Sequence, residues 1–108
     1  MTLNEFQDKA LSFAIFPEDC KVIYPTLGLC GESGEVAEKV KKIIRDNNGA
    51  FTEQKKNEIA LEVGDCLWYI SVLANNLGYA LEDIARMNYD KLESRRQRNK
   101  LHGNGDNR

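Results

Sequence analysis

Two pairs of acidic residues have the residue types and the spacing of a divalent-cation site. Glu32 and Glu35 are three positions apart, and so are Glu62 and Asp65. On a helix, residues three apart share a face, so each pair would present two carboxylates to one side. Carboxylate oxygens suit Mg²⁺ or Mn²⁺ rather than zinc. A single pair of this kind also fits an ordinary solvated helix face, so a metal site requires the two pairs to converge.

The acids lie within long segments that have helical periodicity. We predict four helices over residues 2–15, 24–46, 52–77 and 81–98. Thr2 and Glu5 have capping-box spacing, Thr52 is a second N-cap candidate, and Asn48-Gly49 and Gly78 are stop signals. No alternating strand pattern competes with the helices. The sequence therefore predicts an all-α fold, and 108 residues predict one domain over residues 1–108.

Apolar stripes on the second and third helices indicate where the acids point. The second helix carries the stripe Leu29, Val36, Val40 and Ile43, and the third carries Ile59, Cys66, Ile70, Leu73 and Leu77. Glu32 and Glu62 lie roughly 60° from these stripes, and Glu35 and Asp65 lie roughly 120° away on the same side. If the stripes of two antiparallel helices face each other, both acidic pairs line one cleft.

Convergence of four carboxylates would carry an electrostatic cost. Partly buried like charges raise one another's pKa, and a divalent cation removes the repulsion. Gly34 and Gly64 directly precede Glu35 and Asp65, and each glycine costs about 1 kcal/mol in a helix interior relative to alanine. These glycines predict either close helix packing or room for a ligand beside the acids.

Two strings of the sequence resemble the MazG-like nucleotide pyrophosphohydrolases. They are GLCGESGEVAEKVKKIIRD and EIALEVGDCLWYISVLANNLG, which contain the family's Glu-x-x-Glu motif followed by Glu-x-x-Asp. The likeness extends from Leu27-Gly28-Leu29 to the closing Gly-x-Gly-Asp-Asn-Arg. It implies a four-helix, MazG-like bundle that is completed by oligomerisation, as a homodimer or homotetramer.

The resemblance also implies a reaction and roles for the acids. Glu32, Glu35, Glu62 and Asp65 would bind Mg²⁺, with Mn²⁺ as a possible substitute. A nucleoside triphosphate would be hydrolysed to the monophosphate and pyrophosphate, with water as the nucleophile. Glu35 and Glu38 are the candidates to accept the proton of that water, although Glu38 lies roughly 60° further round the helix, where a solvated role is the alternative.

The fourth helix carries candidate phosphate contacts. Asn88 and Arg95 interrupt its apolar stripe, and Lys91 flanks it. One account is that Arg95 pairs with an acid of the second or third helix while Lys91 is solvated. The account that we favour is that Lys91 and Arg95 contact the outer phosphates, because similar basic positions follow the acidic motif in MazG-like proteins; Asn88 is a weaker substrate-binding candidate.

The polar tail begins at about residue 101. Its composition alone predicts disorder. Its likeness to the closing segment of some relatives implies that it folds over a site, either in its own chain or in a neighbouring subunit.

Composition excludes several classes of protein. A net charge of −2 argues against a nucleic-acid partner. No apolar run approaches the roughly 18 residues that span a bilayer, and the N-terminus does not have the pattern of a signal peptide. The three cysteines lack metal-ligand spacing and are interpreted as reduced thiols. We therefore expect a cytoplasmic protein without a membrane partner.

Trp68 lies opposite the stripe of the third helix, together with Leu61 and Val72. A helix that is apolar on two sides is expected at the centre of a bundle or at a subunit interface. The pattern favours a homo-oligomer, and base stacking by Trp68 is the less favoured alternative.

Other functions remain open at the level of the sequence. A phosphoribosyl-ATP pyrophosphatase shares the carboxylate layout of this superfamily. The non-enzymatic alternative is a helical interaction module in which the acidic residues simply lie on the surface. A di-iron bundle is disfavoured because it uses Glu-x-x-His motifs, and the one histidine, His102, lies in the tail.

Overall fold

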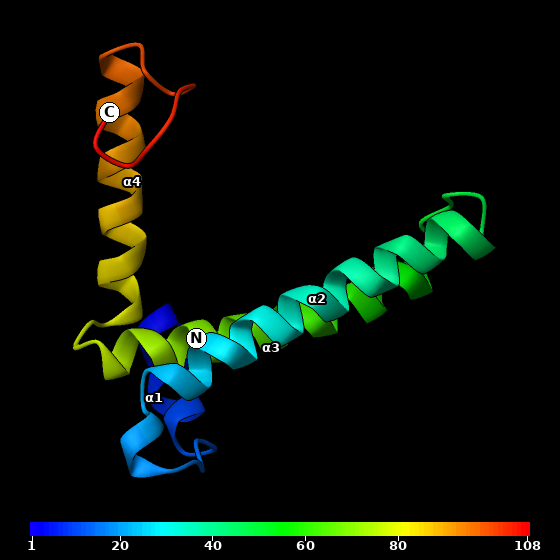
Figure 1. Cartoon of the computed structure of the whole chain (residues 1–108), viewed down its shortest axis with the longest axis horizontal. Coiled ribbons are helices and arrows are strands. Elements are labelled where there is room, and N and C mark those ends of the chain that lie inside the picture. The colour runs from blue at the N-terminus through cyan, green and yellow to red at the C-terminus, as the bar shows by residue number, and fades with distance from the viewer.

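The computed structural model describes all residues from 1 to 108 and contains helices without strands (Figure 1). The elements are α1 (Leu3–Leu11), a short 3₁₀ turn η1 (Glu18–Cys20), α2 (Ile23–Asp46), α3 (Glu53–Asn76) and α4 (Leu81–Gln97). The predicted all-α fold is confirmed. The structure contains no disulfide among Cys20, Cys30 and Cys66.

The predicted N-caps and stop signals define the N-termini of α1 and α3 and the C-termini of α2 and α3. The hydroxyl oxygens of Thr2 and Thr52 accept hydrogen bonds from the amides of Glu5 (3.1 Å) and Lys55 (3.2 Å). Gly49 and Gly78 have φ angles of +75° and +91°, which glycine adopts without strain and which end α2 and α3. Helix caps and glycine stop signals depend on residues that are close in the sequence, so they can be predicted from the sequence alone.

The first helix is shorter than predicted, because it ends at Leu11 and not near residue 15. Ser12 turns its hydroxyl back onto the carbonyl of Lys9 at 2.6 Å. Beyond it, the side chains of Phe13 and Ile15 are 71% and 89% exposed. No packing partner within the chain stabilises a further turn of helix there.

α2 and α3 form a long antiparallel hairpin, with the loop between Asp46 and Glu53 at its tip (Figure 1). Ile43 is 2% exposed in this interface, and most of the remaining residues of the two apolar stripes are half-buried. Leu77, at the end of the α3 stripe, is 53% exposed. The hairpin places the predicted stripes between the two helices, which brings both acidic motifs to one region.

The second apolar side of α3 is covered by α1. The indole N–H of Trp68 donates a hydrogen bond to the carbonyl of Ala10 at 3.1 Å. Val72 is fully buried on the same side, whereas Leu61 remains 65% exposed. This part of the apolar surface therefore belongs to the chain's own core, so Trp68 and Val72 give no support to a subunit interface or to base stacking.

Gln7 fixes the start of α4 from a distance in sequence. Its side-chain oxygen accepts a hydrogen bond from the amide of Leu81 at 2.9 Å, and its nitrogen donates to the carbonyls of Ser71 and Tyr79, both at 3.1 Å. Gln7 is 5% exposed. One buried amide side chain thus joins α1, α3 and the N-terminus of α4.

α4 leads away from the α2–α3 hairpin and gives the chain an open shape (Figure 1). The radius of gyration is 16.7 Å, against about 13 Å for a compact domain of this size. Only nine of the 108 residues are buried. A single chain therefore leaves much of its apolar surface in contact with solvent. None of the helices is both long enough and apolar enough to cross a membrane.

The C-terminal tail folds back against α4 (Figure 1). The Arg108 guanidinium donates hydrogen bonds to the carbonyls of Lys100 (3.1 Å), Leu101 (2.9 Å) and Gly105 (2.5 Å). These bonds close the tail into a loop, which the Arg95 guanidinium of α4 contacts at the carbonyl of Gly105.

Candidate active site

Three of the four predicted ligand carboxylates converge between α2 and α3. Glu32 of α2 and Glu62 and Asp65 of α3 each offer one oxygen, and these oxygens lie within 4.8 Å of one another. We call this group the carboxylate trio. Its members come from the two helices of the hairpin, so the packing of α2 on α3 creates the group.

The glycines beside the acids border open space. A Cβ atom added at Gly31, Gly34 or Gly64 would meet no atom within 4 Å. Of the two explanations given for Gly34 and Gly64, close helix packing is therefore wrong, and room beside the acids fits the structure. The close approach occurs instead at Gly28, where an added Cβ would lie 2.1 Å from the Tyr69 ring.

The surroundings of Glu32 disfavour its ionised form. Burial raises the pKa of Glu32, and the adjacent Glu62 and Asp65 carboxylates raise it further. The ammonium nitrogen of Lys39 lies 3.7 Å from a Glu62 oxygen. Lys39 thus reaches from α2 across to α3. The all-oxygen donor set and the mutual repulsion both suit a divalent cation.

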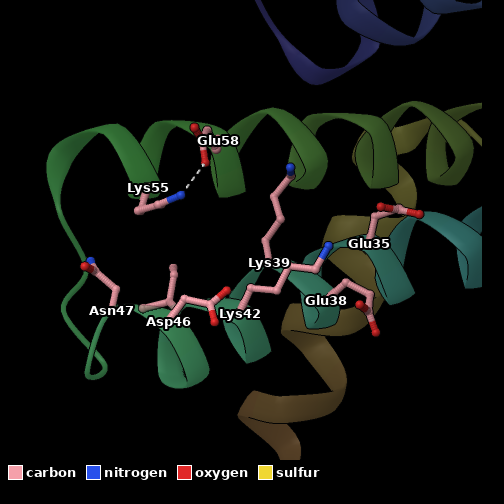
Figure 2. A pocket seen from close by; sticks show the side chains of 9 residues that line it. Glu35, Glu38, Lys39, Lys42, Asp46, Asn47, Lys55 and Glu58 are labelled. Atoms are coloured by element: carbon pink, nitrogen blue, oxygen red, sulfur yellow. Dashed lines mark ion pairs between the residues drawn. The ribbon is translucent and has the colours of Figure 1, made fainter.

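Glu35 lies outside the trio and lines a neighbouring cleft between α2 and α3, together with Glu38 (Figure 2). Its charge still contributes to the raised pKa of Glu32. Glu38 forms a 2.8 Å ion pair with Lys41, which lowers the pKa of Glu38. Glu35 is therefore the better placed of the two candidate proton acceptors.

Comparison with known proteins identifies the family. Residues 25–99 match the family described as the MazG nucleotide pyrophosphohydrolase domain. This chain belongs to that family. It is also 42% identical, over 114 aligned positions that cover all of both chains, to the "Gene 37 protein" of Mycobacterium phage L5. No solved structure matches the chain.

The matched MazG region includes the carboxylate trio, Glu35 and the candidate phosphate contacts of α4. Membership of the family supports nucleotides as the class of substrate and a divalent cation at the acidic group. The name of the phage relative states no activity.

Within one chain, the structure does not bring the candidate phosphate contacts of the MazG domain to the trio. Lys91 and Arg95 lie on α4, in the part that leads away from the hairpin (Figure 1). Both pair with Asp106 of the tail, at 3.1 and 3.3 Å. The ion pair of Arg95 is thus with the tail and not with an acid of the second or third helix. Asn88 is exposed near Lys91, in a shallow hollow on α4.

Sequence reasoning missed two features of the structure near the candidate site residues. The cleft beside Glu35 was not anticipated, although Lys39 and Lys42 follow the acidic motif at helical spacing. The role of Asp106 was also missed. The tail that carries Asp106 was expected to fold over a site, but its partners on α4 depend on how the tail folds back.

Proposed function

We propose that Glu32, Glu35, Glu62 and Asp65 hold Mg²⁺, or Mn²⁺ in its place, and that the protein hydrolyses a nucleoside triphosphate to the monophosphate and pyrophosphate. The observation that carries the proposal is the convergence of three carboxylate oxygens within 4.8 Å in a chain of this family. Glu35 would join the trio by a change of side-chain rotamer, because it is exposed and lies one helical turn from Glu32.

In the proposed reaction the acidic residues hold the cation, and Glu35 also has a catalytic task. Glu32, Glu62 and Asp65 bind and orient the cation. When it is bound, the cation would neutralise charge on the phosphates and lower the pKa of a water molecule. The oxygen of a water molecule attacks the α-phosphorus, and the bond to the bridging oxygen of the β-phosphate breaks. Glu35 accepts the water proton, and Glu38 is the reserve candidate.

We further propose that the active form is a homodimer or homotetramer. Support comes from the open shape of one chain and from large exposed apolar side chains such as Ile15, Ile23 and Leu27, which are 62–89% exposed. In an oligomer, α4 of one copy could present Lys91, Arg95 and Asn88 to the trio of another copy. There the positively charged side chains of Lys91 and Arg95 would contact phosphate oxygens. Light scattering should give a multiple of the chain mass, and a stable monomer would contradict the proposal.

A nucleotide panel tests the reaction directly. ATP, dCTP, dUTP and phosphoribosyl-ATP are incubated with the protein and Mg²⁺, and monophosphate and pyrophosphate are measured together. We expect equal amounts of both products from at least one nucleoside triphosphate. Preference for phosphoribosyl-ATP would assign the related pyrophosphatase activity. Orthophosphate with a diphosphate product would refute the proposed cleavage position, and no product from any nucleotide would favour a non-catalytic module.

A further inference from the structure

A cleft of about 330 Å³ opens between α2 and α3, on the side of Glu35 towards the tip of the hairpin (Figure 2). The residues that line it are Glu35, Glu38, Lys39, Lys42, Ile43, Asp46, Asn47, Lys55 and Glu58. Ile43 is the only apolar member. We call this space the lysine cleft, after Lys39, Lys42 and Lys55.

Ion pairs outside the lysine cleft neutralise two of its acids. Glu38 pairs with Lys41 at 2.8 Å, and Asp46 pairs with Arg45 at 2.7 Å. Neither of these cations lines the cleft. Each of these acids thus has an ion-pair partner outside the cleft. Their charges also attract the cleft lysines, because Lys42 contributes to the lowered pKa of both Glu38 and Asp46, and Lys55 to that of Asp46.

The lysines themselves are only partly compensated. Lys55 pairs with Glu58 at 3.6 Å, and Lys42 takes part in no ion pair among the residues drawn (Figure 2). A lysine ammonium group offers three hydrogen-bond donors and no acceptor. The cleft therefore offers donors that a multiply charged anion would satisfy.

Lys39 connects the lysine cleft to the carboxylate trio. It lines the cleft, and its nitrogen lies 3.7 Å from an oxygen of Glu62. A divalent cation at the trio would compete with this ammonium group for the Glu62 carboxylate, because like charges repel at this range. Displaced from Glu62, Lys39 would remain at the edge of the cleft and could pair with an anion there.

We propose that the lysine cleft is an anion subsite for the pyrophosphate portion of a nucleoside triphosphate. This inference rests on the proposed function, because it places the scissile end of the substrate at the trio. The cleft does not suit the base, since nucleobase pockets use apolar or aromatic walls and Ile43 is the only apolar wall here. Lys39, Lys42 and Lys55 are assigned to phosphate oxygens.

The test is calorimetric titration of the full chain with inorganic pyrophosphate, with and without Mn²⁺, and with Mn²⁺ alone. Lys42→Gln and Lys55→Gln are compared with the control variants Lys21→Gln and Lys56→Gln. The control lysines pair with Glu18 and Glu53, and none of these four residues lines the cleft. Circular dichroism of each variant checks that its helices are intact.

We expect Lys42→Gln and Lys55→Gln each to weaken pyrophosphate binding about fivefold, as for a partly exposed ion pair. The matched controls should stay within about twofold of the wild-type affinity. Lys39→Gln should have opposite effects: tighter binding of Mn²⁺ alone, because a competing cation is removed, and weaker binding of pyrophosphate. If the role of Lys39 were purely structural, its substitution would not strengthen the binding of Mn²⁺ while it weakens the binding of pyrophosphate.

The outcomes separate this inference from the proposed function. Equal loss in the test and control variants, or no loss in either, would overturn the subsite even if the wild type binds Mn²⁺ and hydrolyses nucleotides. Failure of the wild type to bind pyrophosphate under both conditions would also overturn it. Failure to bind Mn²⁺ would refute the metal site alone, and pyrophosphate binding without the cation would then still report on the lysines.

Discussion

The guanidinium group of Arg95 lies against Asp106 of the C-terminal tail. Its Nη2 atom is 3.0 Å from the backbone oxygen of Asp106 and 3.3 Å from a carboxylate oxygen, which also lies 3.1 Å from the Lys91 nitrogen. The Arg95 side chain is only 6% exposed, whereas that of Asp106 is 83% exposed. A carboxylate of the tail thus occupies the position in which these two cations would receive a phosphate oxygen.

Removing this carboxylate should loosen the tail. In Asp106→Ala, Lys91 and Arg95 lose their shared anionic partner, and the loop closed by Arg108 loses its side-chain attachment to α4. We expect amide hydrogen exchange in residues 101–108 to become about fivefold faster, as for the loss of an exposed ion pair. Asn107→Ala is the matched control. Equal exchange in both variants would show that the backbone contact of Arg95 holds the tail by itself.

The acidic residues should be required for hydrolysis and dispensable for folding. Glu35→Gln and Asp65→Asn each remove a charge from the proposed cation site, and we expect turnover to fall at least about 100-fold. Helical content by circular dichroism should not change. Glu53→Gln, at an exposed position of the first turn of α3, is the control. Full activity in both site variants would refute the metal-site assignment.

The stability of the cation-free protein should depend on Glu32. Burial raises the pKa of Glu32 above its usual value of 4.5, with Glu62 and Asp65 adding to the rise. Between 4.5 and the raised value, the folded state holds a proton that the unfolded state has released. The free energy of unfolding should therefore fall as pH rises through this window, with the Glu32 contribution complete below it.

Urea denaturation in the presence of a chelator, from pH 4 to 8, measures this dependence. Glu32→Gln should flatten the pH dependence in the same window, because the titrating group is gone. With saturating Mg²⁺ the wild type should show the opposite trend, since the cation binds the ionised carboxylates. A wild-type curve identical to that of Glu32→Gln without cation would contradict the raised pKa.

Two glycines of α2 should respond oppositely to substitution by alanine. A Cβ at Gly28 would lie 2.1 Å from the Tyr69 ring, so Gly28→Ala should reduce the free energy of unfolding by about 1–3 kcal/mol. Gly34 faces open space, and Gly34→Ala should raise stability by up to about 1 kcal/mol through helix propensity. Chemical denaturation measures both effects. Loss of nucleotide hydrolysis in a stabilised Gly34→Ala would indicate that the substrate uses this space.

The local features of this protein could be predicted from its sequence. Helix periodicity, the Thr2 and Thr52 caps and the stops at Gly49 and Gly78 depend on residues within a few positions of one another, so they survive any uncertainty about packing. The pairing of the acidic motifs could also be predicted, because their angles to the apolar stripes follow from helix geometry. When the apolar stripes of α2 and α3 pack against each other, the two acidic motifs come together.

Only the tertiary structure decided which groups meet beyond that hairpin. It placed Glu32, Glu62 and Asp65 in one trio with Glu35 beside it, turned Lys39 towards Glu62, and set Gln7 at the start of α4. It also placed Asp106 against Arg95, so that Arg95, which the sequence suggested as a phosphate contact, is paired with the tail. Helical periodicity gives the direction of a side chain from its own helix axis. Its partner depends on where other elements run and on which rotamer relieves the local charge, and neither is encoded within a short window of sequence.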